Sequence, residues 1–519
     1  MSDQQPNDQS LDASTPRPPS MLDALIPVVS LIGLIALSVY LFGLDSTNGA
    51  LQVAIFTAMS IAGLIAHKNG YSYPEIGNAV IGGISSAMGA IFILLAVGAL
   101  IGTWNMAGTI PTIVDYGLRI LNPSWFYLAV VVICAVTGSI TGSSWTTSGT
   151  LGVAFVGIGK VMGLSPEITA GAVISGGYFG DKISPLSETT ILVPSLVGGH
   201  TTGKHIRTML WTVGPSIVIA SAIFLVISLT ADADASTADV DAARASLGQA
   251  FNISPFCLLP LVLLVVLSLI KFPAFLSIFL TAIFSGILAI FTQHDLVISF
   301  ANDPGLSDPM ALIKGIYASM ATGYVSNSGV EAIDSLFSRG GMSGMLTTVW
   351  LILGALGFGA IMERAGFLDR LIQGVLGKAR SGGKLVATVI FTALGLNIIA
   401  GDQYIAIVLP SRMFRLEFER RGYKPWVLSR VVEDGGTVTS VLIPWNTCGA
   451  YHTGVLGVST FEYLPYCFFN IINPIISLIY GFTGFQMEKF EPGEPPTEDT
   501  LLPPAKEETA TLQPMESAT

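Results

Sequence analysis

The amino-acid sequence predicts an all-α polytopic membrane protein with two inverted repeats of five transmembrane helices, each with one re-entrant hairpin and one discontinuous helix. The chain has 519 residues, of which 51% are hydrophobic and only 11% are charged, whereas soluble domains carry about 25% charged residues. Apolar runs long enough to span a bilayer recur along the chain. Residues that break helices repeat at one fixed spacing in the two halves.

The stretch 176–190 interrupts an apolar region of helix length. It holds two glycines, a proline, three ionisable side chains and several hydroxyls, between the apolar segments 168–174 and 191–197. Non-helical backbone within a bilayer is tolerated only where it is buried in protein or lines a cavity, so this stretch is a candidate binding site. An ordinary loop between two short segments is the alternative.

A second copy of this pattern favours the binding site. Adding 259 to the residue number carries helix-breaking positions of the first half onto those of the second in one ungapped register: Gly142 onto Gly401, Pro166 onto Pro425, Gly176-Gly177 onto Gly435-Gly436, and Pro185 onto Pro444. Chance agreement in a glycine-rich chain is the alternative. A duplicated pair of interrupted apolar segments is the sequence pattern typical of a secondary-transporter site.

The first repeat is expected over residues 22–230. Its predicted elements are spans over 24–42, 50–66 and 84–103, a hairpin over 125–160, a broken helix over 168–197 and a span over 209–229. The hairpin is inferred because its two apolar arms, which meet at a hydroxyl-rich tip, are shorter than the ~20 residues that one crossing takes. Residues 231–251, which are acidic and rich in Ala and Ser, form the predicted extracellular connector.

The second repeat is expected over residues 252–486. Its predicted elements are spans over 255–270 and 275–291, a polar loop over 292–343, a span over 346–362, an amphipathic basic piece over 364–384, a hairpin with arms 385–398 and 405–414, a broken helix over 426–457 and a span over 464–485. The polar N-terminus, 1–21, and the acidic tail, 487–519, are predicted to be disordered and cytoplasmic, because they hold too few apolar residues to form a core.

Basic residues predict the orientation, because Lys and Arg concentrate in cytoplasmic loops. With five crossings in each half, the main basic loops fall on one side of the membrane: His67-Lys68, Lys204 with Arg207, Lys271, 364–384 and 412–424. The acidic connector and the stretch 292–309 fall on the other side. Both termini are then cytoplasmic, and an odd number of crossings makes the repeats inverted. Arg119 and Lys160 are exceptions, since this threading places them outside.

The sequence disfavours an enzyme, a nucleic-acid-binding protein and a channel. It contains no His-Glu-x-x-His, Gly-x-Ser-x-Gly, Walker or Gly-x-Gly-x-x-Gly motif. A net charge of −11 does not suit nucleic acid, and four widely spaced cysteines predict neither disulfides nor a metal cluster, so no cofactor is expected. Broken helices in repeats are typical of carriers. Gly98 and Gly102 predict close helix packing within the chain, with a homodimer as the alternative.

Four motifs carry a resemblance to a known family. They are Thr141-Gly-Ser-Ser-Trp-Thr-Thr-Ser-Gly-Thr150, Gly180-Asp-Lys-Ile-Ser-Pro-Leu-Ser-Glu-Thr-Thr190, Asp402-Gln-Tyr404 with Leu409-Pro-Ser-Arg-Met-Phe414, and Glu433-Asp-Gly-Gly-Thr-Val-Thr-Ser440 with Ile443-Pro-Trp-Asn-Thr-Cys-Gly449. Together they resemble the NhaC family of Na⁺/H⁺ antiporters, which implies an antiporter of the bacterial inner membrane. Some members exchange malate for lactate with Na⁺ and H⁺. Glu188 stands where the family pattern has Asp, and Gly401 where it often has Ala.

The two breaks hold the residue types that a Na⁺ site requires. Na⁺ prefers oxygen ligands, and an unwound helix frees backbone carbonyls. Asp434 and Asp402 are the predicted carboxylate ligands, and with Asn446 they form the predicted Na⁺ site. The other predicted pocket residues are Thr437, Thr447 and Asn397 in the second half, and Asp181, Ser187, Glu188, Thr189, Thr190, Ser143, Ser144 and Thr146 in the first. For each hydroxyl or amide the alternative is a bond to a freed backbone group, and for Asp181 it is an ion pair with Lys182.

The predicted function is exchange of Na⁺ for H⁺ across the lipid bilayer by alternating access. Burial disfavours the charged form of a carboxylate, so H⁺ and Na⁺ compete for one site and each expels the other. The alternative is a Na⁺/H⁺-coupled antiporter of a small organic anion. Its carboxylate would bind at the positive N-termini of the half-helices that begin near Ser187 and Asn446, with Lys182 and Arg430 adding charge.

Overall fold

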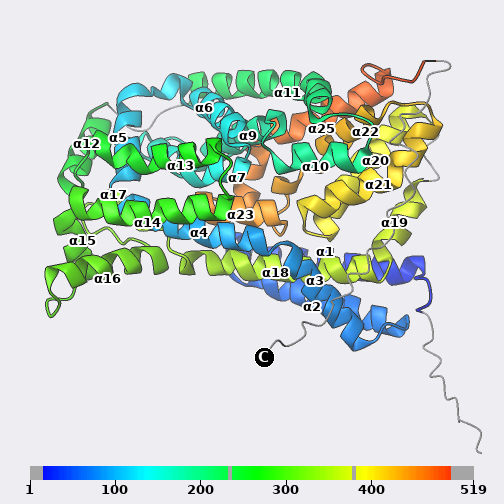
Figure 1. Cartoon of the computed structure of the whole chain (residues 1–519), viewed down its shortest axis with the longest axis horizontal. Helices are drawn as coiled ribbons and strands as arrows, with labels where there is room; N and C mark the ends of the chain where they lie inside the picture. Colours follow the sequence, from blue (N-terminus) through cyan, green and yellow to red (C-terminus); the bar gives the residue numbers. More distant parts are fainter. Residues whose placement is uncertain (1–15, 232–236, 377–380, 492–519) are drawn as a thin grey trace, which may run out of the picture.

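The computed structural model describes residues 16–231, 237–376 and 381–491, and over these ranges the chain is helical, with two isolated β-bridges (Figure 1). The helices up to the connector are α1 (Met21–Phe42), α2 (Ala50–Lys68), α3 (Tyr73–Ser86), α4 (Met88–Met106), α5 (Thr109–Ile120), α6 (Phe126–Thr141), α7 (Ser144–Thr147), α8 (Val153–Val161), α9 (Pro166–Ile183), α10 (Glu188–Val197), α11 (Thr202–Thr230) and α12 (Thr237–Ala250). A π-helical turn, Ser148–Gly152, joins α7 to α8.

Thirteen further helices follow the connector within the described residues. They are α13 (Leu259–Leu269), α14 (Ala274–Thr292), α15 (His294–Ala301), α16 (Asp308–Ala321), α17 (Glu331–Phe337), α18 (Leu346–Arg364), α19 (Phe367–Leu376), α20 (Gly382–Ile399), α21 (Gln403–Arg420), α22 (Pro425–Gly435), α23 (Thr447–Leu456), α24 (Thr460–Tyr463) and α25 (Phe468–Thr483). The N-terminus up to residue 15 and the tail from residue 492, both predicted to be disordered, lie outside the described residues.

Helices of membrane-spanning length dominate the described part of the chain. Eight of them are long and apolar enough to cross a bilayer, or up to ten if each of two bent pairs is one span. The pairs are 240–250 with 255–269, bent by 88°, and 460–466 with 468–483, bent by 56°. The prediction of an all-helical polytopic membrane protein is therefore confirmed.

The spacing of 259 residues recurs in the bounds of the helices. The segment formed by α7 and α8 ends at residue 161 and α21 ends at 420, and α10 (188–197) matches α23 (447–456) residue for residue. Glycines with positive φ also match in pairs: Gly142 (φ 67°) with Gly401 (65°), Gly163 (70°) with Gly422 (74°), and Gly198 (77°) with Gly457 (68°). Glycine adopts positive φ without steric cost, so both halves carry glycine at these matched positions.

The first break lies later in the chain than the glycines suggested. Gly176 and Gly177 were expected to interrupt the helix, but α9 continues through them to Ile183. A side chain at Gly176 would collide with the backbone of Val131 on α6, so this glycine permits close packing of two helices. In the second half α22 does end at Gly435, and residues 436–446 are mostly irregular.

The stretch predicted as a polar loop, 292–343, contains three helices, α15 to α17. Its last part packs closely on α4, where the backbone N of Gly341 donates to the carbonyl of Gly98 (2.6 Å). A side chain at Gly102 would collide with the backbone of Ser319 on α16. The Gly98–Gly102 pair therefore serves packing within the chain. These helices form where the sequence is polar because tertiary packing overrides weak local propensity.

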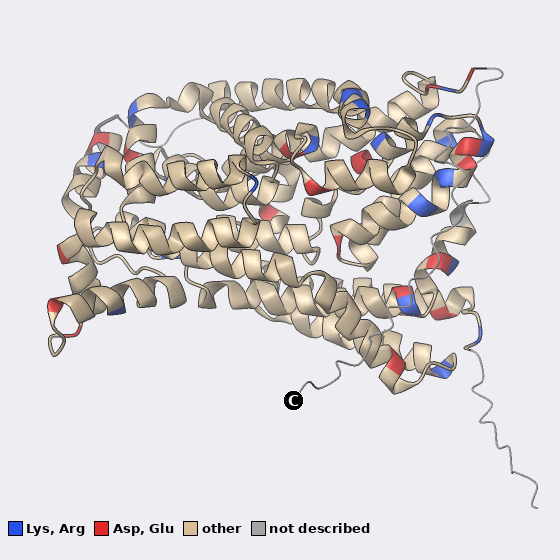
Figure 2. Cartoon of the chain, viewed as in Figure 1, with Lys and Arg blue, Asp and Glu red and all other residues tan. Residues whose placement is uncertain are grey.

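Charge is distributed unevenly along the molecule. Most Lys and Arg residues lie at the end that carries α19, α21 and α22 (Figure 2). The described ends of the chain lie at this same end, where the backbone N of Arg17 donates to the Asn69 carbonyl (2.9 Å) and the backbone N of Lys424 donates to the Glu488 carbonyl (3.0 Å).

Gly401 and Gly422, one glycine from each of two matched pairs, test the turns with positive φ. Gly401→Ala adds a methyl group that collides with Ala355, whereas the same change at Gly422 meets open space. Gly422→Ala should lower the free energy of unfolding only by the strain of a left-handed backbone, about 1–2 kcal/mol. Gly401→Ala should lower the melting temperature of the detergent-purified protein further. Equal melting temperatures for the two variants would contradict the close approach at Gly401.

Candidate functional site

A buried ion pair joins the two halves. Lys182, near the end of α9, places Nζ 2.6 Å from Oδ1 of Asp434, near the end of α22, and neither side chain has any exposed surface (0%). Lys182 also donates to Oδ1 of Asn473 on α25 (3.2 Å), and the Thr212 hydroxyl on α11 donates to Oδ1 of Asp434 (3.1 Å). Four helices therefore build one polar cluster in the interior.

The burial of this pair is costly, which points to function. Removing an ion from water costs several kcal/mol, and only a close partner with further hydrogen bonds offsets it. Oδ2 of Asp434 has no hydrogen-bond partner among the described residues. One carboxylate oxygen is thus held by an ammonium, while the other can accept a cation. Intramembrane ionisable groups of this kind mark ion pathways.

A second buried carboxylate, Glu433, precedes Asp434. Its Oε2 accepts a hydrogen bond from the hydroxyl of Thr437, one of the predicted pocket residues. Its Oε1 faces Nε2 of His205 on α11 at 3.9 Å, and both side chains are fully buried. Consecutive helical residues project about 100° apart, so the two carboxylates contact different neighbours.

In the first half, Asp181 binds the tip of the predicted hairpin. Its Oδ2 accepts hydrogen bonds from the backbone N (3.0 Å) and the hydroxyl (2.8 Å) of Ser144. Ser143 is the N-cap of α7 and accepts from the backbone N of Thr146 (3.1 Å). The alternative of an ion pair between Asp181 and Lys182 is wrong, because Lys182 pairs with the other half instead.

The break between α9 and α10 spans residues 184–187. Ser187 is the N-cap residue of α10, and its hydroxyl lies 3.2 Å from that of Thr189. Thr190 donates to the carbonyl of Lys182 (3.2 Å), whose usual helical partner lies beyond the end of α9. Thr190 therefore binds a backbone carbonyl that the break leaves free. This is the alternative given in the sequence analysis for each hydroxyl.

The longer break between α22 and α23 is satisfied in the same way. Three side chains donate to freed carbonyls: Asn397 to Gly436 (2.7 Å), Asn470 to Val438 (2.9 Å) and Tyr463 to Val441 (3.0 Å). Asn446 donates to Oδ1 of Asn397 (3.0 Å) and caps α23 by accepting from the backbone N of Cys448 (3.0 Å). Buried backbone groups need such partners, and these amides provide them.

Asp402 lies at the tip of the second predicted hairpin. It is the N-cap of α21, and its Oδ1 accepts from the backbone N of Ile405 (3.1 Å). The backbone N of Thr447 donates to the carbonyl of Gly401 (2.9 Å), so this tip contacts the start of α23. Asp402 and Asp434, predicted to share one Na⁺ site, have separate hydrogen-bond partners in this structure.

Contacts between the halves bring the two breaks together. The Tyr178 hydroxyl of α9 lies 3.4 Å from the Ser440 hydroxyl in the second break. Glu188, at the start of α10, accepts a hydrogen bond from Tyr404 of α21. The helix α10 packs against both α21 and α22. The segments around the two breaks are therefore in contact across the two halves.

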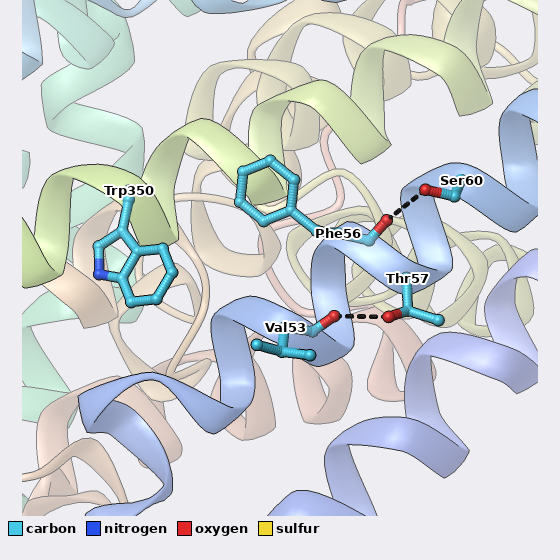
Figure 3. A pocket seen from close by; sticks show the side chains of 5 residues that line it. All are labelled: Val53, Phe56, Thr57, Ser60 and Trp350. Atoms are coloured by element: carbon cyan, nitrogen blue, oxygen red, sulfur yellow. Dashed lines mark hydrogen bonds between the residues drawn. The ribbon is translucent and has the colours of Figure 1, made fainter.

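A groove lies apart from this region, between α2 and α18 (Figure 3). It encloses about 330 Å³ and is lined by Val53, Phe56, Thr57, Ser60 and Trp350. The hydroxyls of Thr57 and Ser60 donate to carbonyls of their own helix (2.8 and 2.9 Å). With no ionisable side chain in its lining, the groove lacks the chemistry of an ion site.

Comparison with known proteins identifies the family. The Na⁺/H⁺ antiporter family matches residues 21–201 and 178–485. The chain belongs to this family. It is 35% identical to the Na⁺/H⁺ antiporter NhaC of Alkalihalophilus pseudofirmus, over 84% of this chain and 91% of that protein. The resemblance inferred from the four motifs is thus confirmed.

Other relatives of this antiporter-family chain carry different substrate names. The Malate-2H(+)/Na(+)-lactate antiporter of Bacillus subtilis is 36% identical, over 84% of this chain and 89% of its own. The arginine/ornithine antiporter ArcD of Halobacterium salinarum is 33% identical, over 92% and 95%. These relatives are named as transporters and not as enzymes.

Several residues of this antiporter-family site were missed by sequence reasoning. Glu433 stands directly before Asp434 in one of the four motifs, so its position was a usable signal. Thr212 and Asn473 carry no local signal, because they lie on full-length apolar spans and meet partners more than 200 positions away. Only the packing of α11 and α25 against the breaks reveals them.

The buried pair can be tested by a double-mutant cycle. Lys182→Met or Asp434→Asn alone leaves an uncompensated buried charge and should destabilise the protein by about 3–5 kcal/mol. The double variant removes both charges and should regain much of that loss. Thermal unfolding in detergent measures all four proteins. Additive losses in the double variant would show that the two side chains do not form a coupled pair.

Proposed function

We propose that the protein exchanges Na⁺ for H⁺ across the membrane by alternating access. The observation that carries this proposal is the pair of Lys182 and Asp434, in which a buried carboxylate has one oxygen held by an ammonium and the other unpartnered. Membership of the Na⁺/H⁺ antiporter family and the similarity to a relative named NhaC support the same function.

Competition at Asp434 gives the exchange. While Lys182 is protonated, the pair is neutral and needs no further cation. Na⁺ at Asp434 adds a second positive charge to a buried site, which is unfavourable unless Lys182 loses its proton or withdraws. Protonation of Asp434 removes the negative charge that attracts Na⁺. Each ion therefore excludes the other. The oxygens of Thr212 and Asn473 are further ligands of the type that Na⁺ prefers.

We propose further that the two repeats, 22–230 and 252–486, are inverted about the connector 231–251. In this arrangement α6 to α8 and α20 with α21 are re-entrant hairpins that open to opposite faces. The helix bounds that recur at a spacing of 259 residues support the repeat. The basic end shared by the described chain ends supports cytoplasmic termini in a bacterial inner membrane (Figure 2).

Exchange of a small organic substrate is the second candidate. It is favoured by the relative named as a malate/lactate antiporter, which is as similar to this chain as the NhaC relative. A carboxylate would bind at the positive N-terminal ends of α10 and α23, where Ser187 is the N-cap residue of α10 and Asn446 caps α23.

Asp434→Asn should abolish Na⁺-driven proton flux, because an amide neither attracts Na⁺ nor carries a transported proton. Purified protein in liposomes is given an inward Na⁺ gradient while a dye reports internal pH. Asp303→Asn is the control, since Asp303 is an exposed carboxylate paired with Lys314 between α15 and α16. Wild-type flux in Asp434→Asn would remove Asp434 from the mechanism. Flux that appears only with malate, lactate, arginine or ornithine would favour the second candidate.

Asp402→Asn separates ion binding from helix capping. Asn caps a helix as well as Asp does, so this variant keeps the turn before α21 and loses only the charge. If Asp402 binds Na⁺, the Na⁺ concentration for half-maximal flux should rise about tenfold, or about 1.4 kcal/mol. Its melting temperature should match the wild type, whereas Asp402→Ala should lose about 1 kcal/mol. If the Na⁺ dependence of flux is unchanged in Asp402→Asn, Asp402 caps α21 and does not bind Na⁺.

A further inference from the structure

Two histidines from different elements meet one serine near the basic end of the molecule. His200, in the loop after α10, places Nε2 2.9 Å from Oγ of Ser429 on α22. His205, on α11, places Nδ1 2.9 Å from the same oxygen. Nδ1 of His200 lies 2.8 Å from the carbonyl of Gly198. At the inner end, Nε2 of His205 faces Oε1 of Glu433 at 3.9 Å.

The donors and acceptors in this series of hydrogen bonds determine where the protons lie. A carbonyl only accepts, so Nδ1 of His200 carries a proton. Burial lowers the pKa of His200 to about 4, so the ring is neutral near pH 7 and its Nε2 can accept the Ser429 proton. The hydroxyl of Ser429 also lies 3.2 Å from the carbonyl of Trp426, so its one proton points to His200 or to that carbonyl, and in either case its oxygen can accept from Nδ1 of His205. In the neutral ring, Nε2 of His205 then carries a lone pair that faces Glu433.

The inner end of this series of hydrogen bonds, at His205, is arranged to accept a proton. Nε2 of His205 and Oε1 of Glu433 are buried, and neither has a hydrogen-bond partner among the described residues. A lone pair that faces a carboxylate oxygen is unfavourable until a proton lies between them. At the other end His200 is only half-buried. The series of hydrogen bonds therefore leads from His200, near the surface, to Glu433 in the interior, which precedes Asp434 on α22.

We propose that His200, Ser429 and His205 form a relay that carries the transported proton between the basic end of the protein and the buried end of α22. This rests on the proposed Na⁺/H⁺ exchange. A proton binds Nε2 of His205, which releases its Nδ1 proton to Ser429. Ser429 passes its own proton to Nε2 of His200, whose Nδ1 proton leaves its hydrogen bond with the Gly198 carbonyl and is taken up by water. One bond to hydrogen forms for each that breaks, and the reverse order carries a proton inward.

The charges at the two ends of the relay differ in sign. Glu433 faces His205 at the inner end, and Lys204 lies near His200 at the outer end. A carboxylate favours a proton on the ring beside it, whereas a nearby ammonium disfavours one. The relay therefore attracts a proton at its inner end and releases it at its outer end.

Ser429→Ala tests the relay, because it removes the hydroxyl that links the two rings and keeps a good helix former in α22. In liposomes, Na⁺-driven proton flux should fall about 100-fold, a typical loss for a positioned proton-transfer group. Exchange of radioactive Na⁺ for Na⁺, which moves no proton, should stay at the wild-type rate. Ser429→Thr keeps the hydroxyl and should restore proton flux. His67→Gln, at an exposed histidine of α2, is the control and should leave both fluxes unchanged.

A second variant, His205→Gln, should show the same selective loss. Proton flux that is unchanged in Ser429→Ala overturns the relay, and so does an equal loss of both fluxes, which indicates a structural role. Wild-type protein without Na⁺-driven proton flux contradicts the proposed function itself. An active wild type together with a proton-competent Ser429→Ala contradicts the relay alone.

Discussion

The burial of opposite charges between the two halves is the constraint on which the rest of the structure depends. Lys182 and Asp434 lie in the interior, where an unpaired charge is strongly unfavourable. The helices α9 and α22 must therefore hold these side chains together, and α11 and α25 must supply Thr212 and Asn473 beside them. In the proposed exchange, an ion that disturbs the pair changes the energy of packing between the halves, and this one contact couples ion binding to their movement.

The breaks persist in a bilayer because the protein itself satisfies their freed backbone groups. Thr190 serves the first break, and Asn397 and Asn470 serve the second. Residues that a sequence pattern assigns to ion binding thus have a structural use in the breaks. Asp434 is different, because no freed backbone N–H accounts for its burial and one of its oxygens has no partner among the described residues.

The repeat could be predicted because glycine and proline act locally. A left-handed turn at Gly142 or Gly401 requires no knowledge of distant partners. The use of Gly176 was mistaken, because a missing side chain permits close packing as readily as it breaks a helix. The partner of Lys182 could not be predicted from the sequence, since it lies 252 positions away and the contact depends on how two helices rotate against each other. The helices within 292–343 likewise depend on packing against α4.

The register of the repeat explains how the charges are divided. Each carboxylate predicted from the sequence matches a hydroxyl residue 259 positions away: Asp434 matches Ser175, Asp181 matches Ser440, Asp402 matches Ser143, and Glu188 matches Thr447, whereas Glu433 matches Ile174. Carboxylates at both members of a pair would add a second set of buried negative charges, which burial and mutual repulsion disfavour. A hydroxyl keeps the oxygen without the charge, as Ser143 and Asp402 show by capping α7 and α21 alike. The repeat therefore places a neutral oxygen-bearing residue in one half at each position where the other half carries a predicted carboxylate.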